Sequence, residues 1–122
     1  RVLVGYGDGA VGFIDVCTHA RITDQDELSC EEHPESFQLG QDGRVYVNIA
    51  DRRVVQVFTQ GKSSLWPLPK GHSMNYPMAL DDQGGRLFVG TRRPSSVVIY
   101  DTSNGSVVQV VPCAGDSDDL YW

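Results

Sequence analysis

Apolar and polar positions follow one repeating pattern along this chain. An apolar run led by arginine occurs three times, at Arg1–Val4, Arg44–Val47 and Arg86–Val89. A second, mostly apolar run follows each of them, at Val11–Asp15, Val54–Phe58 and Val97–Asp101. Short apolar runs without a helical period predict β-strands that are buried on both faces.

Two further strands are predicted in each repeat. Pro34–Leu39 and Pro77–Leu80 precede the arginine-led runs and end in glycine-containing turns, which suit antiparallel connections. A fourth run, such as Ser106–Val111, follows the third strand after another turn. The three arginines that begin the repeats are 43 and 42 residues apart. A period of about 40–45 residues with four strands per unit is typical of propeller blades, so the sequence predicts an all-β fold of β-propeller type with four-stranded antiparallel blades.

The strand pattern divides a single domain of 122 residues into blade-like units. We expect an incomplete blade over residues 1–33, full blades over 34–76 and 77–117, and the start of a further blade at 118–122. About two full blades are then flanked by parts of a third. Thr18–Glu32 should hold the outer strand of the first unit, but it is polar and acidic. This composition suits either a charged edge strand or a loop.

The small number of units bears on the partners that we expect. A blade buries its faces only against neighbouring blades on both sides. Two explanations are open: the chain is a fragment of a longer propeller, or it associates head-to-tail with copies of itself. In the second case residues 118–122 would complete the first blade of another copy, and two copies would form a six-bladed ring.

Charge and cysteine content narrow the function classes. Ten Lys and Arg against sixteen Asp and Glu give a net charge of −6, which makes a nucleic-acid partner improbable. No apolar stretch approaches the ~18–20 residues of a membrane span. The three cysteines allow two alternatives: a Cys17–Cys30 disulfide with Cys113 free, or three free thiols. Cys17, His19, Cys30 and His33 are suitable zinc ligands, but their spacing matches no common zinc pattern, and we expect no metal or cofactor.

The repeat motifs resemble the YVTN-type repeats of bacterial β-propellers, including YncE-like proteins. The matching segments are His33–Leu39, Asp42–Asn48, Gly85–Gly90, Val98–Thr102 and Gly105. The resemblance covers most of the chain from His33 onward, and Phe58 departs from it where other copies have Asp15 and Asp101. It implies the propeller fold and a periplasmic or secreted location. It does not fix a function, because such propellers include binding proteins, lactonases and cofactor-dependent oxidoreductases.

The resemblance also implies where a ligand would bind. In such propellers the ligand site lies where loops entering the innermost strands meet loops joining the second and third strands. The candidate ligand-binding residues from these loops are Arg52, Arg53, Arg92, Arg93, His33, Glu35, Asn75, Tyr76, Asp118 and Asp119. Arginine forks suit carboxylate or phosphate groups, so we expect a small anionic ligand or a protein partner. The alternative is that these arginines only neutralise neighbouring acids on a solvated face.

These observations favour a non-enzymatic scaffold that binds a ligand or a protein partner at the channel mouth. The chain has no glycine-rich phosphate loop that opens a helix and no serine in a strand-to-helix elbow. The alternative is part of a propeller enzyme of the lactonase type, or of a redox- or metal-dependent oxidoreductase type. In that case a loop histidine would act as a base and acidic loop residues would hold a metal.

Overall fold

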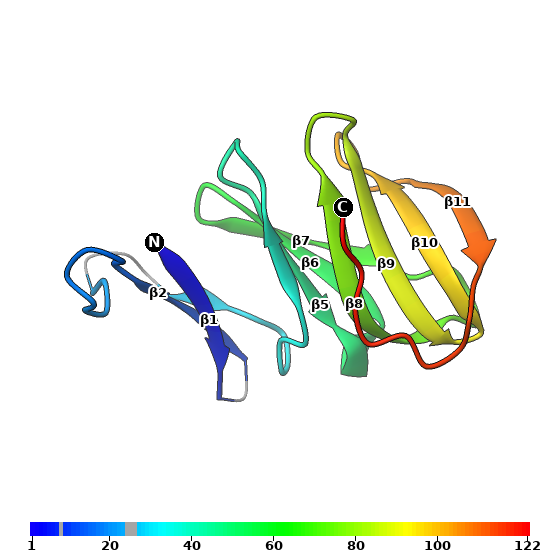
Figure 1. Ribbon diagram of the computed structural model, residues 1–122, viewed down its shortest axis with the longest axis horizontal. Coiled ribbons are helices and arrows are strands. Elements are labelled where there is room, and N and C mark those ends of the chain that lie inside the picture. Colours follow the sequence, from blue (N-terminus) through cyan, green and yellow to red (C-terminus); the bar gives the residue numbers. More distant parts are fainter. Residues whose placement is uncertain (8, 24–26) are drawn as a thin grey trace.

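Three antiparallel sheets lie side by side in the computed structural model, which describes residues 1–7, 9–23 and 27–122 (Figure 1). The first sheet has the order β1-β2-β3, with β1 at Val2–Tyr6, β2 at Ala10–Ile14 and β3 at Leu28–Ser29. The middle sheet has the order β4-β5-β6-β7, with β4 at Phe37–Leu39, β5 at Val45–Ile49, β6 at Val54–Thr59 and β7 at Lys62–Pro67. The third sheet contains β8 at Ser73–Asp81, β9 at Arg86–Arg93, β10 at Ser95–Asp101 and β11 at Val107–Pro112, paired in chain order.

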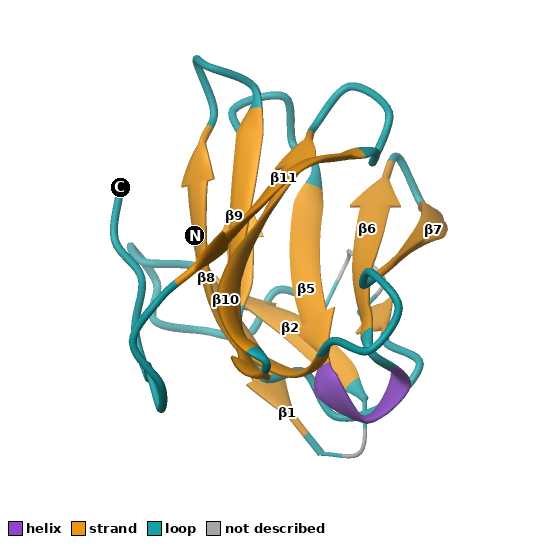
Figure 2. Ribbon diagram, turned by 90° about the vertical axis from the view of Figure 1, so that its right-hand side faces the viewer, coloured by secondary structure: helices purple, strands orange, loops and turns teal. Residues whose placement is uncertain are grey.

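Sequence neighbours pair in both four-stranded sheets, as the turn pattern predicts. In the middle sheet Thr59 pairs with Lys62 across a two-residue turn. Both turn residues, Gln60 and Gly61, have positive φ, which matches the twist of a tight hairpin. The predicted strand order, from the innermost strand through the arginine-led strand to the outer strand, is therefore confirmed. Figure 2 shows one short 3-10 turn, η1 at Ala50–Arg52, between β5 and β6.

Strands β8 and β9 are longer than the sequence pattern suggests. Residues 72–76 and 91–94 lie in predicted loops, yet Ser73 pairs with Arg93 and Asn75 pairs with Thr91. The register shifts between Asn75 and Met78. This irregularity lets polar residues continue the ladder beyond the apolar part of the strand, because the pairing uses backbone groups.

Residues 118–122 form no strand, which differs from the expected start of an innermost strand. Within the described chain no neighbouring second strand supplies the hydrogen bonds that an innermost strand needs. The segment instead packs on the third sheet, where the Trp122 ring stacks on Phe88 with 5.5 Å between ring centroids. In Figure 1 this red segment runs beside β8.

The region of the first unit that was predicted as an outer strand or a loop contains one short strand and one isolated bridge. Leu28 pairs with Val11 and Ser29 with Ala10, which makes a two-residue outer strand. Arg21 forms one isolated bridge with Ile14. Residues 24–26 lie outside the described chain. The first sheet is thus a shorter version of the other two.

Clusters of apolar side chains pack between neighbouring sheets. Between the middle and third sheets, the Trp66 ring lies 5.7 Å from Tyr46 and 5.9 Å from Tyr100. A second buried cluster includes Val11 of the first sheet with Val47 of the middle sheet. The sheets therefore stack face to face, as predicted for blades. Among the described residues there is no helix with the length and apolarity to cross a bilayer.

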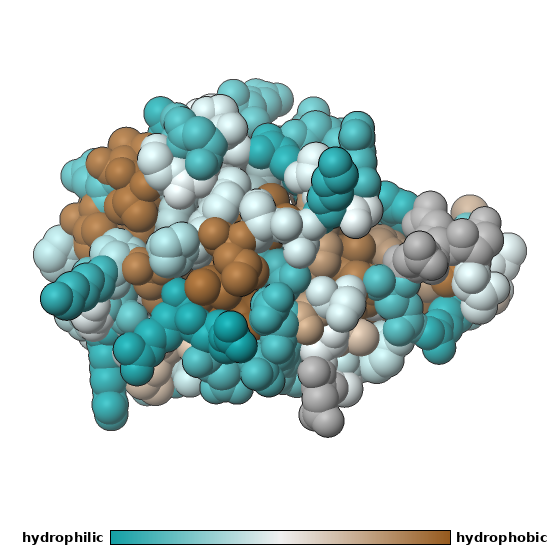
Figure 3. Space-filling view, turned by 180° about the vertical axis from the view of Figure 1, so that it is seen from behind, coloured by the Kyte–Doolittle hydropathy of each residue, from teal (hydrophilic) through white to brown (hydrophobic). Residues whose placement is uncertain are grey.

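The outer strand of the third sheet contributes apolar surface. All six residues of β11 are exposed, and four of them are the valines Val107, Val108, Val110 and Val111. Apolar residues accordingly gather over the third sheet at the left of Figure 3. Other outer strands are more polar, as in Lys62–Ser64 of β7.

Strand pairing corrects the interpretation of Phe58 as a departure from the repeat. Phe58 pairs with Val45 as Ile14 pairs with Val2 and Tyr100 pairs with Leu87, so Thr59 holds the position of Asp15 and Asp101. Asp101 accepts hydrogen bonds from the Ser103 hydroxyl at 2.5 Å and from the Ser103 amide at 2.8 Å. Asp15 accepts from the Thr18 amide at 2.7 Å. The middle sheet needs no such acceptor because its turn is a two-residue hairpin, and Phe58 belongs to a buried cluster, where it is 7% exposed.

The Asp101 turn should make stability depend on pH in the acid range. The Ser103 hydroxyl and amide, with Arg86, hold the pKa of Asp101 below its usual 3.8. A folded-state pKa below that of the unfolded chain stabilises the fold above pH 3.8, and the contribution is lost as the pH falls through the folded-state value. We expect Asp101→Asn to lower the urea midpoint at pH 6, with the difference shrinking at pH 3. Ser103→Ala should weaken this pH dependence, and an equal difference at both pH values would contradict it.

Candidate functional site

A cavity of about 430 Å³ lies where the first strands of the middle and third sheets begin. We call it the mouth cavity, and its lining residues are Glu35, Ser36, Tyr76, Arg92, Asp118 and Asp119. Glu35 and Ser36 directly precede β4, Tyr76 lies in β8, and Arg92 lies near the end of β9. The cavity therefore combines two sheets with the C-terminal segment.

Arg92 is the one cationic side chain among the described lining residues. Its guanidinium lies over the Tyr76 ring, 4.8 Å from the centroid. It hydrogen-bonds to the Asp118 carboxylate and lies 3.3 Å from a carboxylate oxygen of Asp116. A stacked and doubly paired guanidinium makes a fixed planar wall.

The other charges of the mouth cavity are negative. Glu35, Asp118 and Asp119 contribute three carboxylates against one guanidinium, so the lining has a formal charge of −2. Asp118 is paired with Arg92. The side chains of Glu35 and Asp119 have no hydrogen-bond or ion-pair partner within the described chain. The cavity thus offers two uncommitted carboxylates to a ligand.

Asn75 supports this cavity from inside the protein. Its side chain is fully buried, and its amide nitrogen donates to Asn48 Oδ1 at 3.1 Å and to the Val54 carbonyl at 3.0 Å. Asn48 in turn donates to the Tyr76 carbonyl at 3.1 Å and to Ser36 Oγ at 3.1 Å. These bonds join the middle sheet to the third sheet directly behind two lining residues. Asn75 is therefore placed to position the cavity wall, not to contact a ligand.

Besides Asn75, four candidate residues do not line the mouth cavity. Arg52 is exposed, and its Nη2 lies 3.9 Å from Glu31 Oε2. Arg53 has a left-handed backbone (φ 57°) at the end of η1, and its side chain is exposed. Arg93 is also exposed. The His33 ring nitrogen Nδ1 lies 3.0 Å from the Gly7 carbonyl, which is a backbone contact of a loop histidine.

Three residues at or beside the mouth cavity were not predicted from the sequence. Ser36 lies between the candidate Glu35 and β4, and only the folded chain shows that it lines the cavity. Asn48 stands in a fully buried apolar strand where the other repeats have Gly5 and Gly90. That exception was a usable signal, because a buried polar side chain needs hydrogen-bond partners. Asp116 belongs to the acidic run before residue 120, and nothing in its spacing singles it out.

The sulfur and histidine residues do not form a zinc site among the described residues. No three His, Cys, Asp or Glu side chains of that part gather around a common point. All three cysteines are free. Burial raises the pKa of the Cys30 thiol to about 11, which keeps it protonated near neutral pH. Neither the Cys17–Cys30 bridge nor the zinc alternative is present in this structure.

Comparison with known proteins decides the fold. No protein-family model matches, and no curated protein matches. A solved structure described as "Dihydro-heme d1 dehydrogenase NirN in complex with DHE", a known β-propeller, matches 93% of this chain with a TM-score of 0.68 and 22% identity. The chain has a β-propeller fold. The predicted fold class is thus confirmed, with about two four-stranded blades and a partial one.

The same comparison has clear limits. The match covers 24% of the solved chain, so this chain spans about a quarter of that protein's length. At 22% identity the likeness shows the fold and transfers no activity. The more specific assignment to proteins with YVTN-type repeats stays a prediction.

Proposed function

We propose that this propeller chain is a non-enzymatic scaffold that binds a small organic cation at the mouth cavity. The observation that carries the proposal is the pair of uncommitted carboxylates, Glu35 and Asp119, lining a cavity of about 430 Å³. Hydrogen bonds between a charged donor and a carboxylate are among the stronger polar contacts. A ligand with two donor groups would satisfy both carboxylates at once.

The size of the cavity favours an organic ligand over a metal ion. The volume lies within the usual range of small-molecule sites. No three carboxylates of the described chain gather closely enough to hold one metal ion. Separated carboxylates suit a ligand whose donors are also separated. The stacked Arg92–Tyr76 pair would provide a flat wall for the carbon chain between them.

The charge balance argues against the small anionic ligand expected from the sequence. Of the four candidate arginines, only Arg92 lines the mouth cavity. Both Asp116 and Asp118 already contact its guanidinium. An anionic group would have to displace one of them and would also meet Glu35 and Asp119. The negative lining therefore supports a cationic ligand.

Binding of two four-carbon probes of opposite charge tests this proposal. We expect putrescine, a diamine, to bind in isothermal titration calorimetry, and succinate, a dicarboxylate, not to bind. Replacing both Glu35→Gln and Asp119→Asn should weaken putrescine binding at least about tenfold, because two charge-assisted hydrogen bonds are lost.

The matched control removes two other exposed carboxylates, with Glu32→Gln and Asp51→Asn. It changes the net charge by the same amount but leaves the mouth cavity intact. We expect it to change the affinity less than about twofold. An equal loss in both double variants would show that putrescine responds only to overall charge. Tighter binding of succinate would support the anionic alternative instead.

The contacts of the C-terminal segment support our assignment of residues 118–122 to the start of a next blade. Leu120 lies beside Gly90, and Trp122 stacks on Phe88. At the boundary between the first and middle blades, Pro34 lies beside Gly5, which occupies the same repeat position as Gly90. The C-terminal segment thus occupies the face of the third blade that a next blade would cover. Head-to-tail pairing with copies, completion by further blades, a protein partner at the mouth and an enzymatic role all remain predictions.

A further inference from the structure

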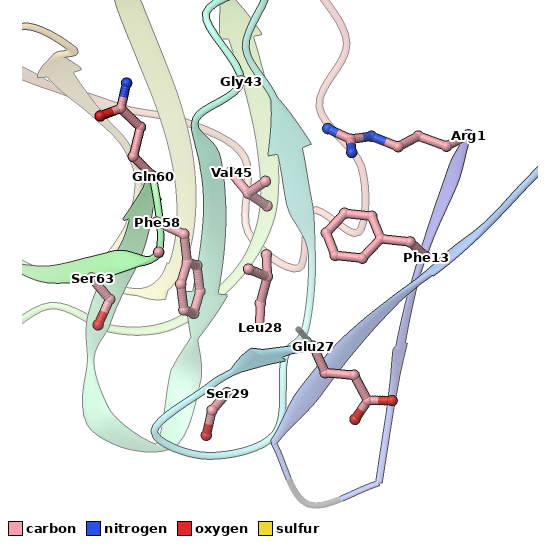
Figure 4. A pocket seen from close by; sticks show the side chains of 11 residues that line it. Arg1, Phe13, Glu27, Leu28, Ser29, Gly43, Val45, Phe58, Gln60 and Ser63 are labelled. Carbon is pink, nitrogen blue, oxygen red and sulfur yellow. The ribbon is translucent and has the colours of Figure 1, made fainter. Parts of the chain in front are cut away.

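A second cavity, of about 600 Å³, lies between the first and middle blades (Figure 4). We call it the lateral cavity. Its apolar walls are the side chains of Phe13, Leu28, Val45 and Phe58. Polar lining comes from Arg1, Glu27, Ser29, Gln60 and Ser63. The Arg1 guanidinium lies over the Phe13 ring, 5.0 Å from its centroid. None of its lining residues belongs to the mouth cavity.

The corresponding space between the middle and third blades is occupied by Trp66. Its indole extends from β7 to the turn after β10, where it lies against Gly105. Tyr46 and Tyr100 flank the indole at centroid distances of 5.7 and 5.9 Å. The Trp66 ring, packed between these two tyrosine rings, therefore connects the middle blade to the third blade.

Strand register identifies the equivalent of Trp66 in the first blade. Trp66 pairs with Val55 in the middle blade. Val11 is the register equivalent of Val55, because Val11 pairs with Gly5 and Val55 pairs with Asn48 at the same position of the arginine-led strands. Val11 also pairs with Leu28. Leu28 therefore occupies the position of Trp66, and it lines the lateral cavity.

The Leu28 side chain is smaller than an indole and does not fill the space that an indole would fill. The preceding residue, Glu27, accepts a hydrogen bond from the Tyr6 hydroxyl and pairs with Arg21. Figure 4 shows its carboxylate directed away from Phe13 and Phe58. The turn at Gln60–Gly61, which corresponds to the Gly105 turn, lines the other end of the cavity. The outer strand and the turn that Trp66 connects at the next blade boundary thus both have equivalents here, and the cavity lies between them.

We infer that the lateral cavity is a binding site for a planar aromatic ligand of about the size of an indole. Such a ring would occupy the place that Trp66 holds at the next blade boundary, with Phe13 and Phe58 in its walls. Aromatic rings favour offset or edge-to-face contacts with one another, which adds to the gain from burying apolar surface. Ser29, Gln60 and Ser63 at the lining supply polar partners for a ring nitrogen or hydroxyl.

Indole itself is the probe. We expect indole to shift the methyl NMR signals of Leu28 and Val45 in a saturable manner and to leave those of Val107–Val111 unchanged. Cyclohexanol, which has a polar group but no planar ring, should bind about fivefold more weakly. Binding of both probes with equal affinity would overturn the aromatic assignment.

A cavity-filling variant makes the test specific. Leu28→Trp copies the arrangement of Trp66, so we expect indole to bind at least about tenfold more weakly. The thermal midpoint should rise by about 2–4 °C, because the indole buries more apolar surface than the leucine side chain. Glu27→Gln keeps the cavity open and should bind indole within about twofold of the parent. Unchanged indole affinity in Leu28→Trp, in a variant that unfolds cooperatively, would overturn the proposal.

Discussion

Replacing Trp66 by alanine is expected to lower the free energy of unfolding by about 3 kcal/mol. The indole joins Tyr46 of the middle blade to Tyr100 of the third blade and also packs against Gly105. Its removal leaves a void in the main cluster between these blades, which the surrounding strands cannot close without breaking their ladders. Urea denaturation followed by far-ultraviolet circular dichroism measures the loss without relying on tryptophan fluorescence.

Trp122→Ala is the matched control for that variant. Trp122 stacks on Phe88, but its side chain is 78% exposed. We therefore expect a loss below about 1 kcal/mol. Equal losses for the two tryptophans would mean that the blades are not held together by the Trp66 contacts.

Asn48→Ala is expected to cost a similar amount, about 3 kcal/mol, through a different mechanism. The Asn48 side chain is fully buried and bonds to Ser36, Asn75 and the carbonyl of Tyr76. Alanine removes one hydrogen bond from each of these partners, and each lost hydrogen bond costs about 0.5–1.5 kcal/mol. The loss appears as a lower urea midpoint with an unchanged denaturant slope.

Asn104→Ala provides the comparison at an exposed turn. Asn104 accepts a hydrogen bond from the Ser106 amide at 2.8 Å, and both groups are accessible to water. Water replaces that bond, so the expected loss is about 0.5–1 kcal/mol. A loss at Asn48 no larger than that at Asn104 would show that the buried network does not hold the blades together.

The fold was predictable because its signals are local. Each arginine-led run is apolar on both faces, and turns such as Asp42–Gly43 and Gly84–Gly85 fix antiparallel neighbours within a few residues. The extension of β8 over Ser73–Tyr76 was not predictable in this way. Those residues are paired with the backbone of β9, and their side chains do not show the apolar pattern that would predict a strand.

The candidate site was predicted at the correct end of the strands but not residue by residue. The sequence places both Arg53 and Arg92 in loops after a second strand, yet only Arg92 lines the mouth cavity. The left-handed backbone at Arg53 ends η1 and leaves its side chain in solvent, whereas Arg92 continues β9 and lies over Tyr76. Backbone conformation beyond the strand ends decides this difference, and residue type alone does not encode it.

The most direct test of the proposed function is a map of the putrescine site by ¹H–¹⁵N NMR titration. The account predicts saturable amide shifts confined to the mouth cavity and its support, namely Glu35, Ser36, Asn48, Asn75, Tyr76, Arg92, Asp118 and Asp119. Shifts spread instead over the exposed acids at Glu31, Glu32, Asp42 and Asp51, without saturation, would contradict it. In that case the mouth cavity would not be the binding site of this propeller.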